Sequence, residues 1–187
     1  MGARLIVRAT NIAGVSIVQT EHVSDNRGAF SRFFCERELA SPLGCRHIVQ
    51  INHSRTEARG ALRGLHYQRP PHAEMKLVRC LSGRVWDVAL DLRHNSPTFM
   101  QWHAEELSCD NACMLIIPEG CAHGFQTLEP ACELLYLHTA AYEKSAEGGV
   151  RHDDPRAGIA WPIAITEISE RDRSLPLLPP MFSGIPL

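Results

Sequence analysis

The chain has 187 residues, enough for one well-filled core or two very small ones, so we expect a single domain. Hydrophobic residues make up 44% and charged residues 21%, which excludes a disordered or fibrous chain. The formal net charge of -2 argues against a dedicated nucleic-acid binder, because such proteins normally carry a basic face or tail.

Apolar runs are short in the parts of the sequence where a targeting or membrane segment would stand out. The run at residues 5–7 is too short for a signal peptide, and no later run approaches membrane-spanning length. We therefore expect a cytoplasmic protein without a membrane partner. The seven cysteines are odd in number and include no C-x-x-C pair, which predicts reduced, mostly buried thiols rather than disulfides or a zinc site.

The N-terminal part reads as short strands and turns. Apolar residues within 5–18 predict two strands around a turn. The cluster at residues 24–28 is typical of a tight turn and has Arg27 near its end. Residues 29–35 are aromatic-rich and strand-like, and residues 36–40 favour one helical turn.

Residues 48–53 alternate apolar and polar side chains, which is typical of a half-buried strand. Gln50 and Asn52 then share one face of that strand. A polar pair that points inward needs hydrogen-bond partners, and a bound ligand is one candidate.

Residues 63–68, Arg-Gly-Leu-His-Tyr-Gln, place a histidine in a predicted strand, with Arg63 and Lys76 close by in sequence. Histidine titrates near neutral pH, so His66 and its cationic neighbours could carry out proton transfer. A strand histidine alone, however, is more often an interior polar group. In a regular pleat Arg63 and His66 would lie on opposite faces. They share one site only if the strand is irregular near Gly64, which a β-bulge would allow.

The strongest strand pattern covers residues 76–81 and 84–92, and the intervening Ser82-Gly83 turn predicts a hairpin. Its second strand has an apolar face formed by Trp86, Val88, Leu90 and Leu92.

Further strands are predicted at residues 99–107, 114–117, 122–128 and 132–139. Short strands about ten residues apart, separated by Gly/Pro turns, favour an antiparallel sandwich or barrel. Residues 141–160 are loop-rich, and residues 168–173 favour one helical turn before a proline-rich tail.

Two segments, residues 64–83 and 118–123, are similar to parts of a cupin barrel. A metal-binding cupin would need an H-x-H pair, a following glutamate and a later histidine. Here the next histidine after His66 is His72, which lies across a double proline. We therefore expect no metal, and a site that works by proton transfer or binding alone.

Several separated motifs together resemble the dTDP-4-dehydrorhamnose 3,5-epimerase family, over about residues 25–178. They are Arg63-Gly64-Leu65-His66-Tyr67-Gln68, Lys76-Leu77-Val78-Arg79, Asp87-Val88-Ala89, Asp91-Leu92-Arg93, Ser96-Pro97-Thr98-Phe99, Ile117-Pro118-Glu119-Gly120-x-Ala122-His123-Gly124-Phe125 and Gly158-Ile159-x-Trp161-Pro162. The resemblance implies an all-β fold, a cupin-type double-stranded β-helix (jelly-roll barrel) with a few short helices. It also implies one domain over residues 1–187, with residues 163–187 as a C-terminal turn and tail packed on the barrel.

The resemblance implies an isomerase without cofactor that epimerises C3 and C5 of a nucleotide-linked 4-keto-6-deoxy sugar. The expected reaction converts dTDP-4-dehydro-6-deoxyglucose to dTDP-4-dehydrorhamnose, in dTDP-rhamnose biosynthesis or another deoxysugar pathway for lipopolysaccharide or natural-product glycosylation. His66 would be the base and Asp172 its orienting carboxylate. Tyr136 would be the acid on the other face, and Lys76 would stabilise the enolate oxygen.

The same resemblance implies residues that bind the nucleotide. The expected contacts to the pyrophosphate and base come from Arg27, Gln50, Asn52 and Arg63, with Tyr142 stacking on the base, Arg171 assisting and His123 in the substrate pocket. Without the resemblance, scattered arginines read as solvated surface and His123 as a structural residue. The family also implies a homodimer, in which the N-terminal strands are candidates for exchange between subunits.

The chain departs from the family pattern at Arg32, Leu137 and Met75, and these changes leave the expected proton-transfer residues in place. Within the same class, the alternatives are a C3-only epimerase or a 3,4-ketoisomerase acting on a related nucleotide sugar. From other classes come a metal-dependent cupin oxygenase and a cupin that binds a sugar nucleotide without catalysis.

Overall fold

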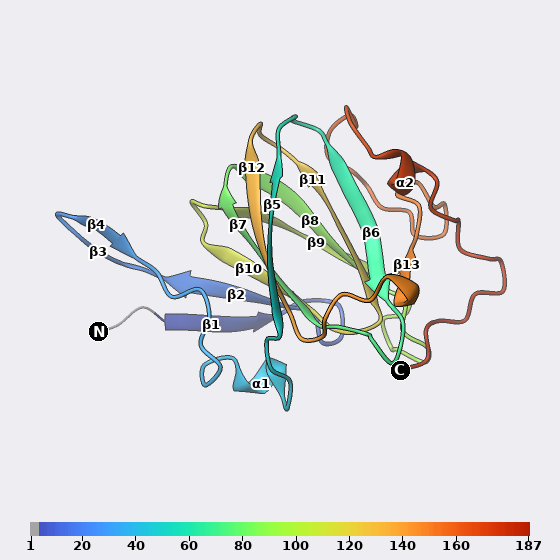
Figure 1. Ribbon diagram of the computed structural model, residues 1–187, viewed down its shortest axis with the longest axis horizontal. Coiled ribbons are helices and arrows are strands. Elements are labelled where there is room, and N and C mark those ends of the chain that lie inside the picture. The colour runs from blue at the N-terminus through green and yellow to red at the C-terminus, as the bar shows by residue number, and fades with distance from the viewer. Residues whose placement is uncertain (1–3) are drawn as a thin grey trace.

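The structure, a computed structural model, describes residues 4–187 as two antiparallel sheets packed face to face (Figure 1). The six-stranded sheet has the order β1 (Arg4–Ala9), β2 (Ser16–Glu21), β10 (Cys113–Ile117), β7 (Lys76–Ser82), β12 (Cys132–His138) and β5 (Gln50–Thr56). The five-stranded sheet has the order β13 (Glu147–Gly149), β6 (Leu62–Gln68), β11 (Cys121–Thr127), β8 (Arg84–Asp91) and β9 (Trp102–Ser108). The predicted all-β barrel is confirmed.

A two-stranded arm and three short helical segments complete the structure. Strands β3 (Val23–Asp25) and β4 (Gly28–Phe30) form a hairpin that projects from the sheets, at the left of Figure 1. The helical segments are α1 (Ala40–Leu43), the 3-10 turn η1 (Lys144–Ala146) and α2 (Glu170–Arg173). Strand β13 falls within residues 141–160, a stretch that the sequence predicts to be loop-rich.

The predicted hairpin of β7 and β8 is wrong, although both strands and the turn between them exist. Strand β7 pairs with β10 and β12, whereas β8 pairs with β9 and β11 in the other sheet. Gly83, at φ +74, carries the chain across, and a Cβ there would lie 2.7 Å from Sγ of Cys132. A local turn signal predicts a reversal of the chain, but it does not determine which strands will pair.

Apolar side chains fill one end of the space between the sheets. Val78, Leu115 and Leu134 of the six-stranded sheet pack there with Val85 and Phe125 of the five-stranded sheet. This core borders the polar cavity described below, because Phe125 belongs to the core and also lines the cavity.

The outer face of each sheet is also covered. The predicted apolar face formed by Trp86, Val88, Leu90 and Leu92 is confirmed, with Trp86 only partly buried, and it packs against Leu178 and Ile185 of the C-terminal segment. Two isolated bridges, Leu62 with Ile168 and Arg93 with Ile185, also join this segment to the sheets. The assignment of residues 1–187 to one domain stays a prediction.

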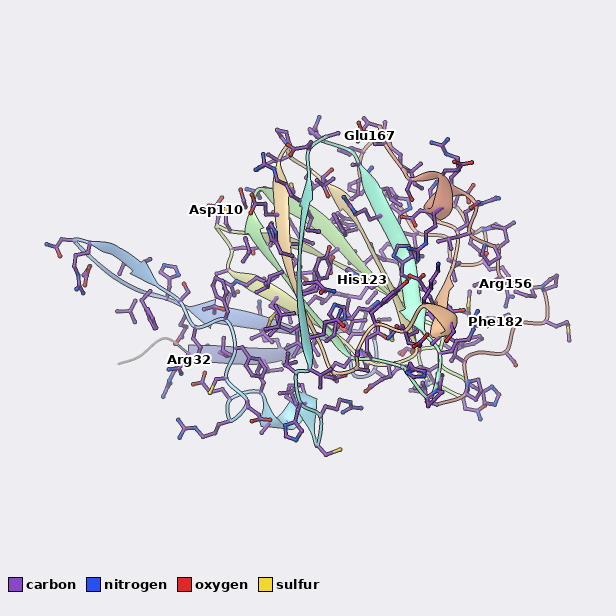
Figure 2. All side chains as sticks on the ribbon, in the orientation of Figure 1. Arg32, Asp110, His123, Arg156, Glu167 and Phe182 are labelled. Carbon is purple, nitrogen blue, oxygen red and sulfur yellow. The ribbon has the colours of Figure 1, made fainter. Side chains whose placement is uncertain are left out.

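The other outer face carries two of the three departures from the family pattern. Met75 and Leu137 are buried with Leu39 and Leu43 of the α1 region, on the side of the sheet that faces away from the cavity. Arg32 pairs with Glu38 near the base of the arm. Figure 2 shows Arg32 well away from His123, which lies inside the barrel.

Two expectations drawn from composition can be compared with the structure. Cys80, Cys113, Cys121 and Cys132 are buried, as predicted for thiols within apolar strands. Among residues 4–187, no helix has the length and apolar character needed to cross a membrane.

Candidate active site

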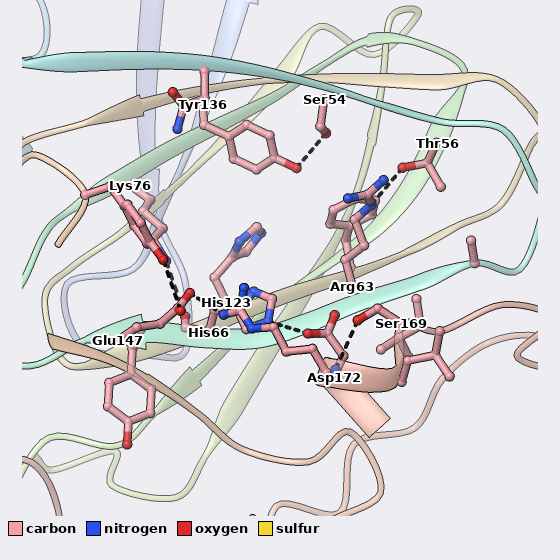
Figure 3. A pocket seen from close by; sticks show the side chains of 18 of the residues that line it. Ser54, Thr56, Arg63, His66, Lys76, His123, Tyr136, Glu147, Ser169 and Asp172 are labelled. Carbon is pink, nitrogen blue, oxygen red and sulfur yellow. Dashed lines mark hydrogen bonds and ion pairs between the residues drawn. The ribbon is translucent and has the colours of Figure 1, made fainter. Parts of the chain in front are cut away.

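A polar cavity of about 950 Å³ opens between β5 and β12 of one sheet and β6 of the other, beside α2 (Figure 3). Ten of the eleven residues predicted from the sequence line it: Gln50, Asn52, Arg63, His66, Lys76, His123, Tyr136, Tyr142, Arg171 and Asp172. The cavity therefore brings together residues from separate strands and from the C-terminal turn.

His66 and Asp172 form a close polar pair on the β6 side of the cavity. Nε2 of His66 lies 2.7 Å from Oδ1 of Asp172, whose other oxygen accepts the Gly64 N–H at 3.0 Å. The Ser169 hydroxyl caps helix α2 by accepting the Asp172 N–H, which fixes the backbone from which this carboxylate extends. Burial alone would raise the pKa of Asp172, but the hydrogen bonds from His66 and Gly64 outweigh burial and lower the pKa. The buried carboxylate is therefore held charged against an imidazole that stays partly open to the cavity.

The predicted irregularity near Gly64 is confirmed. On strand β11, His123 pairs with His66 and Phe125 pairs with Arg63, so two residues of β6 stand opposite one of β11. Gly64 has φ +109, and a Cβ there would lie 2.6 Å from the His123 carbonyl oxygen. This break in alternation allows Arg63 and His66 to line the same cavity. Arg63 Nε donates to the Thr56 hydroxyl at 3.1 Å, as Figure 3 shows.

Lys76 is buried and paired, not solvated. Its Nζ lies 3.0 Å from Oε1 of Glu74 and 3.3 Å from the His66 carbonyl oxygen. The side chains are only 11% and 4% exposed, respectively, for Lys76 and Glu74. Such charge-assisted contacts fix the position of the ammonium group at the cavity wall.

His123 forms a second histidine–carboxylate pair deeper in the barrel. Its Nε2 lies 2.7 Å from Oδ1 of Asp87, which is fully buried. The His123 ring also meets the edge of the Tyr136 ring, with centroids 6.1 Å apart. His123 therefore lines the cavity with its orientation fixed by Asp87, a partner that the sequence motif contained but did not identify as such.

Tyr136 and His138 stand on the opposite wall, on alternate positions of β12. The Tyr136 hydroxyl lies 3.0 Å from Oγ of Ser54. Burial raises the pKa of Tyr136 above the ordinary value of a tyrosine. His138 stacks on Tyr136 with ring centroids 6.2 Å apart. Burial, with the nearby charges of Lys76 and His123, lowers the pKa of His138 to about 4, so this ring is neutral at neutral pH.

The outer part of the cavity carries amide, aromatic and cationic groups. Gln50 Oε1 accepts the Tyr142 N–H at 3.0 Å, and Gln50 Nε2 donates to Asn52 at 3.2 Å. The Tyr142 side chain is exposed and its hydroxyl contacts Glu147, which also pairs with Arg171. This end can hold a planar base and an anionic group.

Arg27 is the one predicted site residue that the chain does not bring into its own cavity. It lies at the exposed tip of the β3–β4 arm and pairs with Asp25, with an Nη2–Oδ2 distance of 2.6 Å. This ion pair holds the pKa of Asp25 below its usual value. The predicted contact of Arg27 with the nucleotide would require a second copy of the chain.

Polar cavity residues that the sequence interpretation missed include Ser54, Glu74, His138 and Glu147. The alternation of β12 already placed His138 on the Tyr136 face, so that signal was available. Glu74 follows a double-proline loop, and nothing in its sequence position indicates that it is buried. Among residues 4–187, no group of three or more His, Cys, Asp or Glu side chains is arranged to hold a metal ion.

Comparisons with known proteins identify the family of the chain. The family model for dTDP-4-dehydrorhamnose 3,5-epimerase matches residues 9–179. The dTDP-4-dehydrorhamnose 3,5-epimerase of Salmonella typhimurium is 43% identical over 176 residues, which cover 93% of this chain and 96% of the relative.

Two solved structures extend the comparison. The dTDP-6-deoxy-D-glucose-3,5-epimerase of Legionella pneumophila, in complex with dTDP-4-keto-L-rhamnose, has a TM-score of 0.88 and 36% identity, and the match covers 93% of each chain. A 3'-monoepimerase from Streptomyces bikiniensis, in complex with dTDP-quinovose, has a TM-score of 0.84 and 30% identity, and covers 91% of this chain and 86% of its own. The family match, spanning most of the chain, confirms the resemblance seen in the sequence: the chain belongs to the dTDP-4-dehydrorhamnose 3,5-epimerase family.

Proposed function

We propose that this enzyme epimerises C3 and C5 of dTDP-4-dehydro-6-deoxyglucose, giving dTDP-4-dehydrorhamnose. The single observation that carries the proposal is the placement of the His66–Asp172 pair in one cavity with Lys76 and Tyr136. The family membership and the ligand of the Legionella structure support the choice of a dTDP-linked keto sugar. With that product, the enzyme belongs to dTDP-rhamnose biosynthesis.

The chemistry follows from the keto group. The carbonyl at C4 acidifies the hydrogens at C3 and C5. His66 removes one of them, the C–H electron pair forms a C=C bond to C4, and the C4 oxygen takes the negative charge. Asp172 holds the ring of His66 in position and stabilises its protonated form. Lys76 stabilises the enolate oxygen, and Tyr136 returns a proton from the opposite face, which inverts the carbon.

The nucleotide lies at the outer end of the cavity in this proposal. Arg63 and Arg171 bind the diphosphate, because guanidinium groups pair well with phosphate oxygens. Gln50 and Asn52 contact the base, and Tyr142 stacks on it. His123 contacts the sugar from the deep end. No metal or cofactor takes part.

We further propose that the active form is a cytoplasmic homodimer. The arm of β3 and β4 projects away from its own sheets and carries Arg27 at its tip. Exposed apolar side chains on the arm, on β1 and at the start of β5, including Phe30, Ile51 and the preceding Val49, favour contact with a second copy. A dimer related by a twofold axis would carry one arm to each partner's cavity.

The test is an NMR measurement of substrate incubated with the enzyme in deuterated water. We expect solvent deuterium at both C3 and C5, and the same rates after treatment with a chelator. A protein that only binds the nucleotide sugar would show no exchange. Loss of exchange with the chelator would contradict the metal-free mechanism.

The second candidate is a C3-only epimerase. It is favoured by one observation, the similarity to the 3'-monoepimerase of Streptomyces bikiniensis over most of both chains. Deuterium at C3 without deuterium at C5 would replace the first proposal with this one.

A further inference from the structure

Glu74 carries a polar atom that the proposed mechanism does not use. Five side-chain nitrogen or oxygen atoms in residues 4–187 are buried without a hydrogen-bond partner, and Oε2 of Glu74 is one of them. Of the five, only the Glu74 atom belongs to a residue that lines the cavity. Leaving a buried carboxylate oxygen unpaired is costly, so this atom calls for a donor from the cavity.

The other oxygen of Glu74 is already engaged. Oε1 lies 3.0 Å from Nζ of Lys76, whose second contact is the His66 carbonyl oxygen at 3.3 Å. An ammonium group has three donors, so one of the Lys76 hydrogens is left for a ligand. The Lys76–Glu74 pair therefore presents one free donor and, right beside it, one free acceptor.

We propose that Glu74 is a specificity-determining residue that accepts a hydrogen bond from the hydroxyl group next to the keto carbon. The ligand that matches a neighbouring donor and acceptor is an α-hydroxy ketone: Lys76 donates to the carbonyl oxygen, and the adjacent hydroxyl donates to Oε2 of Glu74. In the substrate of the proposed function, on which this inference rests, that hydroxyl is the one on C3. C5 carries no hydroxyl, and the C2 hydroxyl is one carbon farther from the carbonyl.

The contact has a different consequence for each reacting carbon. C3 has only a hydrogen and a hydroxyl outside the ring, so fixing the hydroxyl also fixes the direction of the C3 hydrogen. Glu74 thereby aligns that hydrogen with His66, a positional effect to which catalysis is sensitive. At C5 the group that accompanies the hydrogen is a methyl group, which cannot donate a hydrogen bond to Glu74. Lys76, by contrast, contacts the C4 oxygen and serves both enolates equally.

The test is the ratio of deuterium exchange at C3 to exchange at C5 in Glu74→Gln, with Lys76→Met as the comparison. Glutamine keeps an oxygen for Lys76 and places an amide donor where Oε2 stood. We expect the C3:C5 ratio to fall about tenfold in Glu74→Gln, as for loss of one hydrogen bond to a charged group. Lys76→Met should lower both rates and leave the ratio near the wild-type value. The ratio does not depend on how much of the variant is folded.

A second readout uses a substrate analogue without the C3 hydroxyl. Glu74→Gln should bind the normal substrate more weakly than wild type, and should bind the 3-deoxy analogue as well as wild type does. An unchanged C3:C5 ratio, with both rates reduced or both normal, would overturn the inference, because Glu74 would then act only through Lys76 or not at all. Weaker binding of both ligands would overturn it as well. Failure of wild type to exchange at either carbon would instead refute the proposed function.

Discussion

Nε2 of His66 lies 2.7 Å from Oδ1 of Asp172, although the two residues are 106 positions apart in the chain. The contact joins the middle of strand β6 to the first turn of helix α2. Since the Ser169 cap and the Gly64 N–H both hold Asp172, the carboxylate cannot easily turn away from the imidazole. The arrangement suits a base that must present one ring nitrogen to the substrate in a fixed direction.

Replacement of His66 tests its role as the base. We expect His66→Ala to reduce deuterium exchange at both C3 and C5 by about 10² to 10⁴, the usual contribution of general acid–base catalysis. Binding of dTDP should be retained, which distinguishes loss of the base from loss of the fold. His47 is exposed and lies outside the cavity, so His47→Ala is the matched control. Near-normal turnover of His66→Ala would remove His66 from the mechanism.

Gly64 tests whether the bulge in β6 is required for the site. Its φ is +109, and a Cβ at this position would lie 2.6 Å from the Cα of Gly124 on strand β11. Gly158 is the matched control, because it also has positive φ, +57, but its nearest atom would be 4.0 Å away. We expect Gly158→Ala to cost about 1 kcal/mol of unfolding free energy, the penalty of the left-handed backbone.

Gly64→Ala should cost more than about 3 kcal/mol, because the clash is with backbone that cannot move independently of the sheet. Urea denaturation of both variants measures the difference. Similar midpoints for the two variants would show that strand β6 can relax at this position without loss of stability.

His138 predicts how stability depends on pH. Burial lowers the pKa of His138 to about 4 from the ordinary value of 6.5. Between these values the unfolded chain binds a proton that the folded chain does not, so the neutral ring's contribution is complete above about pH 6.5 and is lost as the pH falls toward about 4. Acidification to about pH 5 should therefore cost up to about 2 kcal/mol through this residue.

The measurement compares urea midpoints at about pH 7.5 and about pH 5 for wild type and His138→Gln. Other groups titrate in both proteins, so the difference between the two shifts isolates His138. We expect the smaller shift in the variant. Equal shifts would mean that His138 takes up its proton as readily in the folded chain as in the unfolded chain.

The sequence was sufficient to predict much of the fold, because alternation and turn residues are local signals. The strands at β7, β8 and β12 and the helical turn at α2 lie close to where the patterns place them. Strand pairing is not local, and Ser82-Gly83 shows the limit: the turn is real, but the two strands join different sheets. The jelly-roll arrangement came from the family resemblance, which carries long-range information that alternation lacks.

The site shows the same division. The pleat pattern made an irregularity near Gly64 the condition for Arg63 and His66 to share one cavity, and the family resemblance placed both residues in the site. The structure shows the irregularity. Glu74 could not be predicted as a partner of Lys76, since a lysine and a glutamate two positions apart near a loop are usually both solvated. In the folded chain both side chains are nevertheless buried and paired with each other.

The position of Arg27 gives the last prediction, which concerns the proposed dimer. If the arm of one subunit completes the cavity of the other, Arg27→Ala and His66→Ala should each be weakly active, and a mixture of the two should recover activity. In a mixed dimer, the cavity with intact His66 receives the arm with intact Arg27. With random exchange of subunits, about a quarter of all cavities would be complete, so about a quarter of wild-type turnover is expected.

The control is a mixture of His66→Ala with Asp172→Asn, because both residues lie in the same cavity of one chain. That mixture should recover nothing. If the Arg27→Ala and His66→Ala mixture also stays inactive after subunit exchange, which sedimentation of size-tagged subunits can verify, Arg27 does not act across subunits.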